Sequence, residues 1–391
     1  GALGIDTNQT LAYQIFTFLC ALLAAAMLAS LFARPRVQVV RRLPRMITAG
    51  RAFDYGVLVK NIGTRATDGL ALLEDLADPR PAFAEFRSSL RFPSYRGWSR
   101  LARRNQVAHV DDTALPALAA NAEAEIRVQG IAYRRGTLKI EAATVARADP
   151  LGLFRSLARV ALPDKIIVLP RRYSLPQLAL PGARRYQHGG VTLASSVGES
   201  EEFMSLRDYR PGDPLQRIHW KSYARSGKPV VKEYQDEYFE RHALVLDTFT
   251  DHDGVVFEEA VSLAASFACT LDTQECLLDL MFIGAESYCY TAGRGQLQPG
   301  NLVEILAGVR ACGHSNFRRL HDAVLARRAA LSGCILILLA WDEPRQELVR
   351  ALRQSGFPLK ALVVSESKIA LAPAWLHVLL PGKIQEGLAT L

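Results

Sequence analysis

Two aspartates in the last third of the chain follow apolar runs, where their side chains could support metal chemistry. Asp247 ends the run His242–Leu246, and Asp342 follows the run Cys334–Ala340. Both runs indicate buried strands, and parallel sheets place ligand sites at the carboxyl ends of their strands. Carboxylate oxygens are the ligands that hard divalent cations such as Mg²⁺ prefer. The two aspartates are therefore candidates for a cation site at one edge of a sheet.

The elements that must position these carboxylates alternate along residues 236–391. Apolar runs predict strands at 242–246, 276–283, 334–340 and 359–364, and helical spacing is found at 255–271, 302–309, 320–329 and 344–354. Such alternation predicts an α/β domain of three layers, with an open, mostly parallel sheet and helices on both faces. The chain has no dinucleotide-binding glycine motif, P-loop, nucleophile elbow or zinc-protease motif.

Residues 35–170 have a different pattern. Apolar and polar residues alternate over 122–129, and residues 53–59 and 166–169 also favour short strands. Several short strands with turn signals predict an antiparallel β-sandwich. Residues 85–104 interrupt this pattern with six arginines, one acid and four aromatic residues. This stretch indicates either a contact with the inner leaflet of a membrane or a solvated excursion between strands.

The segment Leu11–Ala33 predicts a membrane anchor within residues 1–33. Its 23 residues include no Asp, Glu, Lys or Arg, and a helix of that length would span about 34 Å, enough to cross a bilayer. Five arginines follow within twelve residues, without an acid among them. The positive-inside rule then places the soluble regions in the cytoplasm, on the inner membrane. The six cysteines form no disulfide or zinc pattern and fit a reducing compartment.

A basic stretch, residues 171–235, connects the two soluble regions. Arg210-Pro211-Gly212-Asp213 predicts a turn, after which Asp213 could cap a short helix. Arg217 and Lys221 would share one face of that helix, and Trp220 would be an apolar anchor. The polar side chains could form a surface that binds an acidic partner, or a network that fixes the connector onto the next domain. The candidates are Arg207, Tyr209, Arg210, Asp213, Arg217, His219, Trp220 and Arg225.

The connector resembles the family called domain of unknown function 58. The turn, the run Arg217–Trp220 and the pair Ala224-Arg225 correspond to the central signature of that family. Asp149–Phe154 is similar to the element that follows the family's Arg-Gly strand, which is Arg135-Gly136 here. The resemblance implies a bacterial membrane protein with two N-terminal helices, of which residues 1–33 would contain the second and the first would be missing. It also implies a MoxR-type AAA+ ATPase as partner.

The resemblance further implies that residues 236–391 form a von Willebrand factor A-like domain. Such domains often hold a divalent cation through an Asp-x-Ser-x-Ser motif and later Thr and Asp residues. Here the motif is Asp247-Thr248-Phe249-Thr250-Asp251, and Ser315 and Asp342 stand near the later positions. Phe249 offers no side-chain oxygen, so a Mg²⁺ site would be degenerate. The alternative is that Asp247 only caps the next helix.

The charge of the chain is concentrated in three stretches. The net charge of +8 combines +17 in residues 34–51, 85–104 and 171–232 with −9 elsewhere. This distribution points to an inner-leaflet surface and to an arginine network that is either partner-facing or structural. The family resemblance implies a membrane-anchored, non-enzymatic interaction or scaffold protein that works with the ATPase in the assembly or activation of other complexes. The alternative is a metal-dependent hydrolase that uses Asp247, Asp251, Asp342 and His219. Nucleic-acid binding is the least favoured function, because the chain has a membrane anchor and no recognised nucleic-acid motif.

Overall fold

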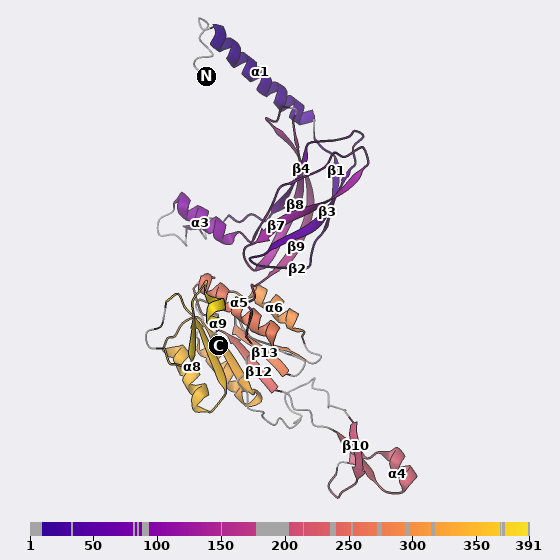
Figure 1. The fold of residues 1–391 in the computed structure, drawn as a ribbon, viewed down its shortest axis with the longest axis vertical. Coiled ribbons are helices and arrows are strands. Elements are labelled where there is room, and N and C mark those ends of the chain that lie inside the picture. Colours follow the sequence, from indigo (N-terminus) through magenta and orange to yellow (C-terminus); the bar gives the residue numbers. More distant parts are fainter. Residues whose placement is uncertain are drawn as a thin grey trace. The chain divides into compact units, whose positions relative to one another are not determined.

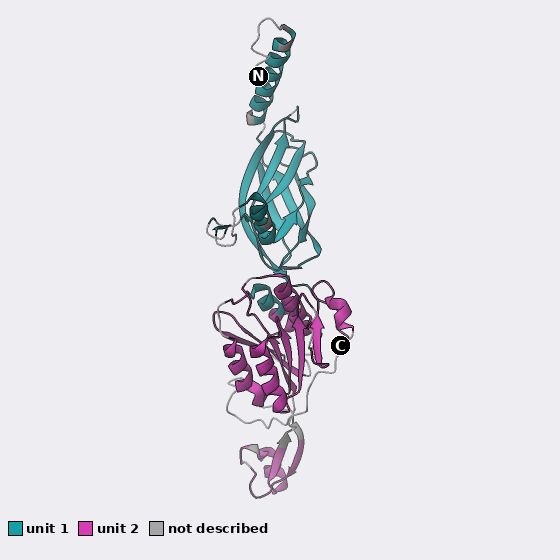
Figure 2. Cartoon of the chain, turned by 90° about the vertical axis from the view of Figure 1, so that its left-hand side faces the viewer, with its two compact units in different colours: residues 1–172, 303–309 teal, residues 173–302, 310–391 magenta. Residues whose placement is uncertain are grey.

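The computed structural model places helices and strands along most of the chain (Figure 1). It describes residues 10–32, 34–80, 83, 86–87, 94–149, 151–176, 203–213, 215–234, 240–251, 253–271, 276–293, 297–313, 317–367, 369 and 372–389. The chain divides into two compact units, which Figure 2 colours separately. The first comprises residues 1–172 and 303–309, and the second comprises residues 173–302 and 310–391.

The N-terminal helix α1, Thr10–Phe32, is apolar along its whole length. Its segment Tyr13–Ser30 is long and apolar enough to cross a membrane, and little of that segment is buried by the protein. An apolar helix that is exposed to solvent would be unfavourable in water, because its side chains would remain hydrated. The helix therefore fits a membrane anchor.

Two β-sheets make up most of the first unit. The first sheet has the order β1-β3-β7-β5 and the second has the order β2-β9-β8-β4-β6. The strands of the first sheet are β1 (Val37–Arg42), β3 (Ala52–Asn61), β5 (Ala108–Val110) and β7 (Glu123–Ala132). Those of the second are β2 (Met46–Thr48), β4 (Leu70–Leu76), β6 (Thr113–Ala114), β8 (Gly136–Ala148) and β9 (Arg155–Leu169). Neighbouring strands are antiparallel except for the parallel pair β2 and β9.

Alternating side chains from both sheets form one hydrophobic core. Val57 and Val59 of β3, Ile140 of β8 and Ile166 of β9 are among its fully buried members. The period-two pattern therefore had the expected cause, because one face of each strand is directed toward the shared core. The predicted strands at 53–59 and 122–129 correspond to β3 and β7.

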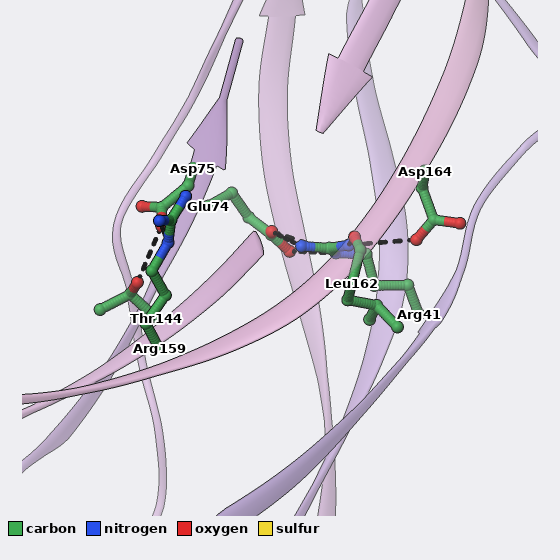
Figure 3. A network of polar contacts seen from close by, with 7 residues as sticks. All are labelled: Arg41, Glu74, Asp75, Thr144, Arg159, Leu162 and Asp164. Atoms are coloured by element: carbon green, nitrogen blue, oxygen red, sulfur yellow. Dashed lines mark hydrogen bonds and ion pairs between the residues drawn. The ribbon is translucent and has the colours of Figure 1, made fainter. Parts of the chain in front are cut away.

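A buried ion pair crosses this core (Figure 3). Arg41 occupies the inward-facing side of β1, and its Nε lies 3.0 Å from Oε1 of Glu74 on β4. Both side chains are only 1% exposed. The Arg41 Nη1 also donates to the Leu162 carbonyl at 2.5 Å and to Asp164 Oδ2 at 3.0 Å on β9. Arg41 therefore connects the first sheet to two strands of the second.

The Leu162 carbonyl is available because β9 contains a β-bulge. Ile140 pairs with Asp164 and Ala142 pairs with Ala161, so Leu162 and Pro163 both lie opposite one residue of β8. A bulge leaves main-chain groups outside the regular ladder. The Leu162 carbonyl accepts its hydrogen bond from the guanidinium of Arg41 instead.

Part of the arginine-rich stretch forms a helix, α3, Tyr95–Asn105. Ser94 begins the helix by accepting a hydrogen bond from the Gly97 amide at 3.1 Å. Leu101 is buried, whereas Arg103 and Arg104 are exposed. This part of the stretch is a helix between β4 and β5 with one buried and one exposed side, and neither the membrane contact nor the solvated excursion is decided by it. Most of residues 85–93 lie outside the described part of the chain.

The second unit is built on a six-stranded sheet of order β14-β13-β12-β15-β16-β17. Its strands are β12 (Glu240–Leu246), β13 (Cys276–Ile283), β14 (Ser287–Ala292), β15 (Gly333–Leu338), β16 (Leu359–Val364) and β17 (Leu376–Leu379). All neighbours are parallel except β13 and β14. The chain also forms α5 (Val255–Thr270), α6 (Pro299–Gly308), α7 (Arg318–Arg327), η3 (Arg328–Ala330), α8 (Glu343–Gln354) and α9 (Ile384–Leu388).

Helices pack against both faces of this sheet. Leu320 of α7 and Leu348 of α8 share a core with Ala243 and Val245 of β12. Helix α5 also contacts β12, β15 and β16, but its buried residues do not belong to that core. Because successive strand residues are directed to opposite faces, α5 covers the face that carries Leu244. The open, mostly parallel sheet predicted from the sequence is thus observed, with one antiparallel strand at its edge.

Candidate functional site

Residues 203–234 form a small unit that we call the signature hairpin. Strands β10 (Phe203–Asp208) and β11 (Val230–Tyr234) are antiparallel, and the segment between them contains η2 (Leu215–Arg217) and α4 (Trp220–Ser226). Ile218 bridges to Val231, and both are buried. The His219 amide donates to the Val230 carbonyl at 2.8 Å. This pairing separates η2 from α4, so Arg217 and Lys221 do not share one continuous helix as the sequence predicted.

An ion pair fixes the turn of the signature hairpin. The Arg207 guanidinium donates to both oxygens of Asp213, at 2.7 and 2.8 Å. The Arg210 amide also donates to Asp213 Oδ2, at 2.8 Å. These bonds, the one from Arg207 first, lower the pKa of Asp213 to about 2. The Asp213 carboxylate therefore turns back onto the hairpin and stabilises the turn. Gly212 has φ of 107°, a conformation that other residues rarely adopt.

His219 contacts its own helix rather than an acidic group. Its Nδ1 lies 2.7 Å from the Ser222 hydroxyl, and its carbonyl accepts from the amides of Ser222 and Tyr223 in the first turn of α4. These contacts are typical of a residue that fixes a helix start. Among the described residues, the hydrogen bond of the imidazole is to the Ser222 hydroxyl, and no carboxylate is recorded beside it.

The segment between the two strands of the signature hairpin exposes apolar, aromatic and positively charged side chains. Trp220 is 62% exposed and Tyr223 is also exposed, with their rings in an edge-to-face contact at 6.1 Å between centroids. Leu215 is 65% exposed. Lys221 and Arg225 are exposed as well. Trp220 is therefore a surface residue, whereas the sequence suggested an apolar anchor.

The remaining candidates in the signature hairpin are Tyr209, Arg210 and Arg217. The Tyr209 amide donates to the Pro229 carbonyl at 3.0 Å, which extends the pairing of the two strands. Arg210 is exposed. The Arg217 side chain lies outside the part of the chain that the structure describes. From residue 205 to residue 232 the sequence has seven Lys or Arg and two Asp, a net charge of +5.

The second candidate is the strand-end site at the carboxyl ends of β12 and β15. Asp247 follows β12 and its side chain is fully buried. Its Oδ1 accepts from the Phe249 amide at 2.9 Å, and its Oδ2 accepts from the Leu339 amide at 3.0 Å and from Arg345 Nε at 2.6 Å. Asp247 thus joins the loops after two neighbouring strands, and it does not cap a helix.

Arg345 brings the two candidate aspartates together. Asp342 is the N-cap of α8, and its Oδ2 accepts from Arg345 Nη1 at 2.5 Å. Arg345 Nη2 donates to the Phe249 carbonyl at 3.0 Å, and the guanidinium lies over the Phe317 ring at 5.0 Å. Burial would lower the pKa of Arg345, but Asp247 and Asp342 outweigh burial and raise it. The guanidinium therefore stays charged between two carboxylates.

This arrangement does not fit a divalent metal. The guanidinium lies between Asp247 and Asp342, and Phe249 offers only its carbonyl, which binds Arg345. Ser315 lies outside the described residues. Among the residues that are described, no group of three or more His, Cys, Asp or Glu side chains could hold a metal ion. The hydrolase alternative, which needs such a group, receives no support from these contacts.

Sequence reasoning found both aspartates but missed Arg345. The available signal was its place in the chain, three residues after Asp342 and in the first turn of α8. A positive charge there opposes the helix dipole, so a compensating acidic partner was to be expected. A buried arginine also needs acceptors for its five N–H groups. Asp247, Asp342 and the Phe249 carbonyl each accept one hydrogen bond from Arg345.

Comparison with known proteins gives a family for the middle of the chain. Residues 205–287, which include the signature hairpin, match the model of a family described as "Protein of unknown function DUF58". The Bacillus subtilis (strain 168) "Uncharacterized protein YeaD" is 28% identical over 177 residues, which cover 44% of this chain and 42% of that protein. The two findings support the domain of unknown function 58 family. The chain matches less than half of the length of this curated relative.

Solved structures with similar segments cover about a third of the chain. The CARDB domain of PF1109 from Pyrococcus furiosus has 14% sequence identity and a TM-score of 0.21, over 34% of this chain and 95% of that one. The native alpha-2-macroglobulin from Escherichia coli has 15% identity and a TM-score of 0.21, over 38% of this chain and 8% of that one. Scores this low carry no argument about fold or function.

Proposed function

We propose that the protein is a membrane-anchored scaffold that binds an acidic protein partner through its signature hairpin. The observation that carries this proposal is the exposure of Trp220, Tyr223 and Leu215, together with that of Lys221 and Arg225, within one short segment. Exposed aromatic residues and arginine are enriched where proteins bind one another, and a local excess of positive charge favours an acidic surface. These five residues also lie within residues 205–287, the segment that matches the family model.

In this proposal the partner is a MoxR-type AAA+ ATPase, as the family resemblance implies. The ATPase would supply the energy, and the present chain would bring it to the inner membrane for the assembly or activation of other complexes. Helix α1 would anchor the protein with its soluble units in the cytoplasm, as the arginines after it favour. No enzymatic role is proposed for the chain.

The two soluble units have defined parts in the proposal. We propose that the sheets of the first unit form a β-sandwich, which their shared core supports. The second unit would be a von Willebrand factor A-like α/β domain, which its six-stranded sheet and the helices on both faces support. The first would act as a spacer from the bilayer, and the second would carry the signature hairpin.

Co-purification from membranes tests the proposal. The full chain in detergent should retain a purified MoxR-type AAA+ ATPase, and the double variant Trp220→Ala/Tyr223→Ala should lose most of it. Interface aromatic residues cost about 2 kcal/mol or more each when truncated, so binding should fall at least about 30-fold per strong contact.

The chain contains a matched control for this experiment. Tyr95 and Trp98 of α3 also stack on one another, and Tyr95 is strongly exposed, but both lie in the first unit. The variant Tyr95→Ala/Trp98→Ala should bind the ATPase as the wild type does. Equal binding by all three proteins, or binding by none, would contradict the proposal.

A further inference from the structure

We propose that Arg345 is the built-in cation of the strand-end site and that it closes this site to divalent metal ions. The site is defined by Asp247, Asp342, the Phe249 carbonyl and Arg345. This inference does not depend on the proposed partner. It concerns what neutralises the carboxylates at the edge of the sheet where metal chemistry was expected.

The carboxylate oxygens of Asp247 already accept hydrogen bonds from the protein. Asp247 is fully buried, and its two oxygens already accept two main-chain amides and Arg345 Nε. A metal ion would need an oxygen lone pair that points away from these donors. Oδ1 accepts from one donor and Oδ2 from two among the described residues, and Arg345 occupies the position between Asp247 and Asp342 that a shared metal ion would take. Binding a metal would therefore require the guanidinium to leave.

The positive charge of Arg345 would also repel a divalent metal ion at this site. The guanidinium lies within hydrogen-bond distance of both carboxylates, so a divalent ion that bound them would lie close to a positive charge. Repulsion between such charges is strong where water is excluded. The Arg345 side chain is only 8% exposed, and the Phe317 ring lies 5.0 Å from the guanidinium. The repulsion is least screened at Asp247, which is fully buried, and more screened at Asp342, whose side chain is 47% exposed.

The Arg345 guanidinium also binds a main-chain carbonyl in addition to the two carboxylates. Its third acceptor is the carbonyl of Phe249, at the motif position where a cation-binding loop would offer a hydroxyl. Phe249 also contacts Phe317 edge-to-face, with 5.4 Å between ring centroids. Arg345 therefore ties the loop after β12 to the first turn of α8. A metal ion would join the same two segments through its coordination bonds.

The test compares variants that remove or keep the positive charge. In Arg345→Gln the charge is lost, so the two aspartates should become a cation site. The unfolding temperature of this variant should be below that of the wild type in EDTA and should rise, with saturation, when Mg²⁺ is added. In Arg345→Lys the charge remains but the three-way hydrogen bonding is lost. This variant should be less stable than the wild type and should not respond to Mg²⁺.

The measurements use the full chain in detergent, with Mg²⁺ as the probe in thermal unfolding and calorimetric titration. The wild type should show no saturable Mg²⁺ binding. The double variant Arg345→Gln/Asp247→Asn should lose the response gained by Arg345→Gln, which assigns that response to the strand-end site. Saturable binding by the wild type that Asp247→Asn abolishes would overturn the proposal. A folded Arg345→Gln protein without any Mg²⁺ response would also overturn it. If Arg345→Gln does not fold, the Mg²⁺ titrations of the wild type and of Arg345→Lys still test the proposal.

Discussion

Replacing Glu74 with Gln should destabilise the first unit strongly, because it would leave the Arg41 charge buried without its main partner. Both side chains are 1% exposed, and Arg41 makes two Nε contacts and one Nη2 contact with Glu74. After the change, Arg41 would retain the Leu162 carbonyl and the partly exposed Asp164. Removing one partner of a buried pair typically costs about 3–5 kcal/mol. For a unit of this size, that corresponds to a fall of roughly 10–20 °C in unfolding temperature.

Hydrogen–deuterium exchange on the full chain is the suitable assay, because a protein with two units need not unfold in one step. Peptides from β1, β4 and β9 should exchange faster in Glu74→Gln, while peptides from the six-stranded sheet should not change. Figure 3 shows a matched control, the pair of Arg159 and Asp75. Arg159 is 61% exposed, so Arg159→Ala should cost less than about 1 kcal/mol.

A third variant tests whether the loss of stability comes from the unpaired buried charge. In Arg41→Met/Glu74→Leu both charges are removed and the space is refilled by apolar side chains. This double variant should be considerably more stable than Glu74→Gln and close to the wild type. If Glu74→Gln were no more destabilising than Arg159→Ala, the reasoning about burial would be refuted.

Two further predictions concern pH. The folded pKa of Asp213 is about 2, below its unfolded value of about 3.9. The contribution of the Asp213–Arg207 pair should therefore be complete above about pH 4 and be lost as the pH falls toward 2. A carboxyl NMR titration should show this, and Asp213→Asn should remove the dependence. Burial lowers the pKa of His242, although Glu240 opposes this. Stability that depends on neutral His242 should be present above about pH 6.5 and be lost below it. In His242→Leu the unfolding temperature should depend less on pH over that range. A pH dependence equal to that of the wild type would contradict the assignment.

The sequence predicted best two interior strands of the six-stranded sheet, in which most residues are buried. The apolar runs at 276–283 and 359–364 correspond residue for residue to β13 and β16. A strand that is covered on both faces is mostly apolar, so its pattern is strong even where β13 carries Asp279 and β16 carries Lys360. Weakly patterned strands were missed, including β1, β10 and β11. Arg41 interrupts the apolar alternation of β1 at an inward-facing position, since its partner is a charge from a distant strand.

The candidate sites were predicted only in part, for the same physical reason. Asp247 could be found because it ends a strand, which is a local feature. Its partner Arg345 is 98 residues away in the chain, and their contact at 2.6 Å depends on how the sheet and α8 pack. The exposure of Trp220 also depends on tertiary structure, because the residues around it would be equally compatible with a buried anchor.

The contacts of β1 with β9 determine how the first unit would respond to mechanical load. Arg34 Nε donates to the Leu157 carbonyl at 3.2 Å, and Arg41 contacts Asp164, so the two segments run in the same direction. The chain reaches β1 from the anchor α1 and leaves β9 toward the second unit. Opposite pulls on these ends would slide the strands past each other and load the Arg41 bonds together rather than one after another. The buried ion pair would then resist shear between the segment that follows α1 and the strand that leads to the second unit.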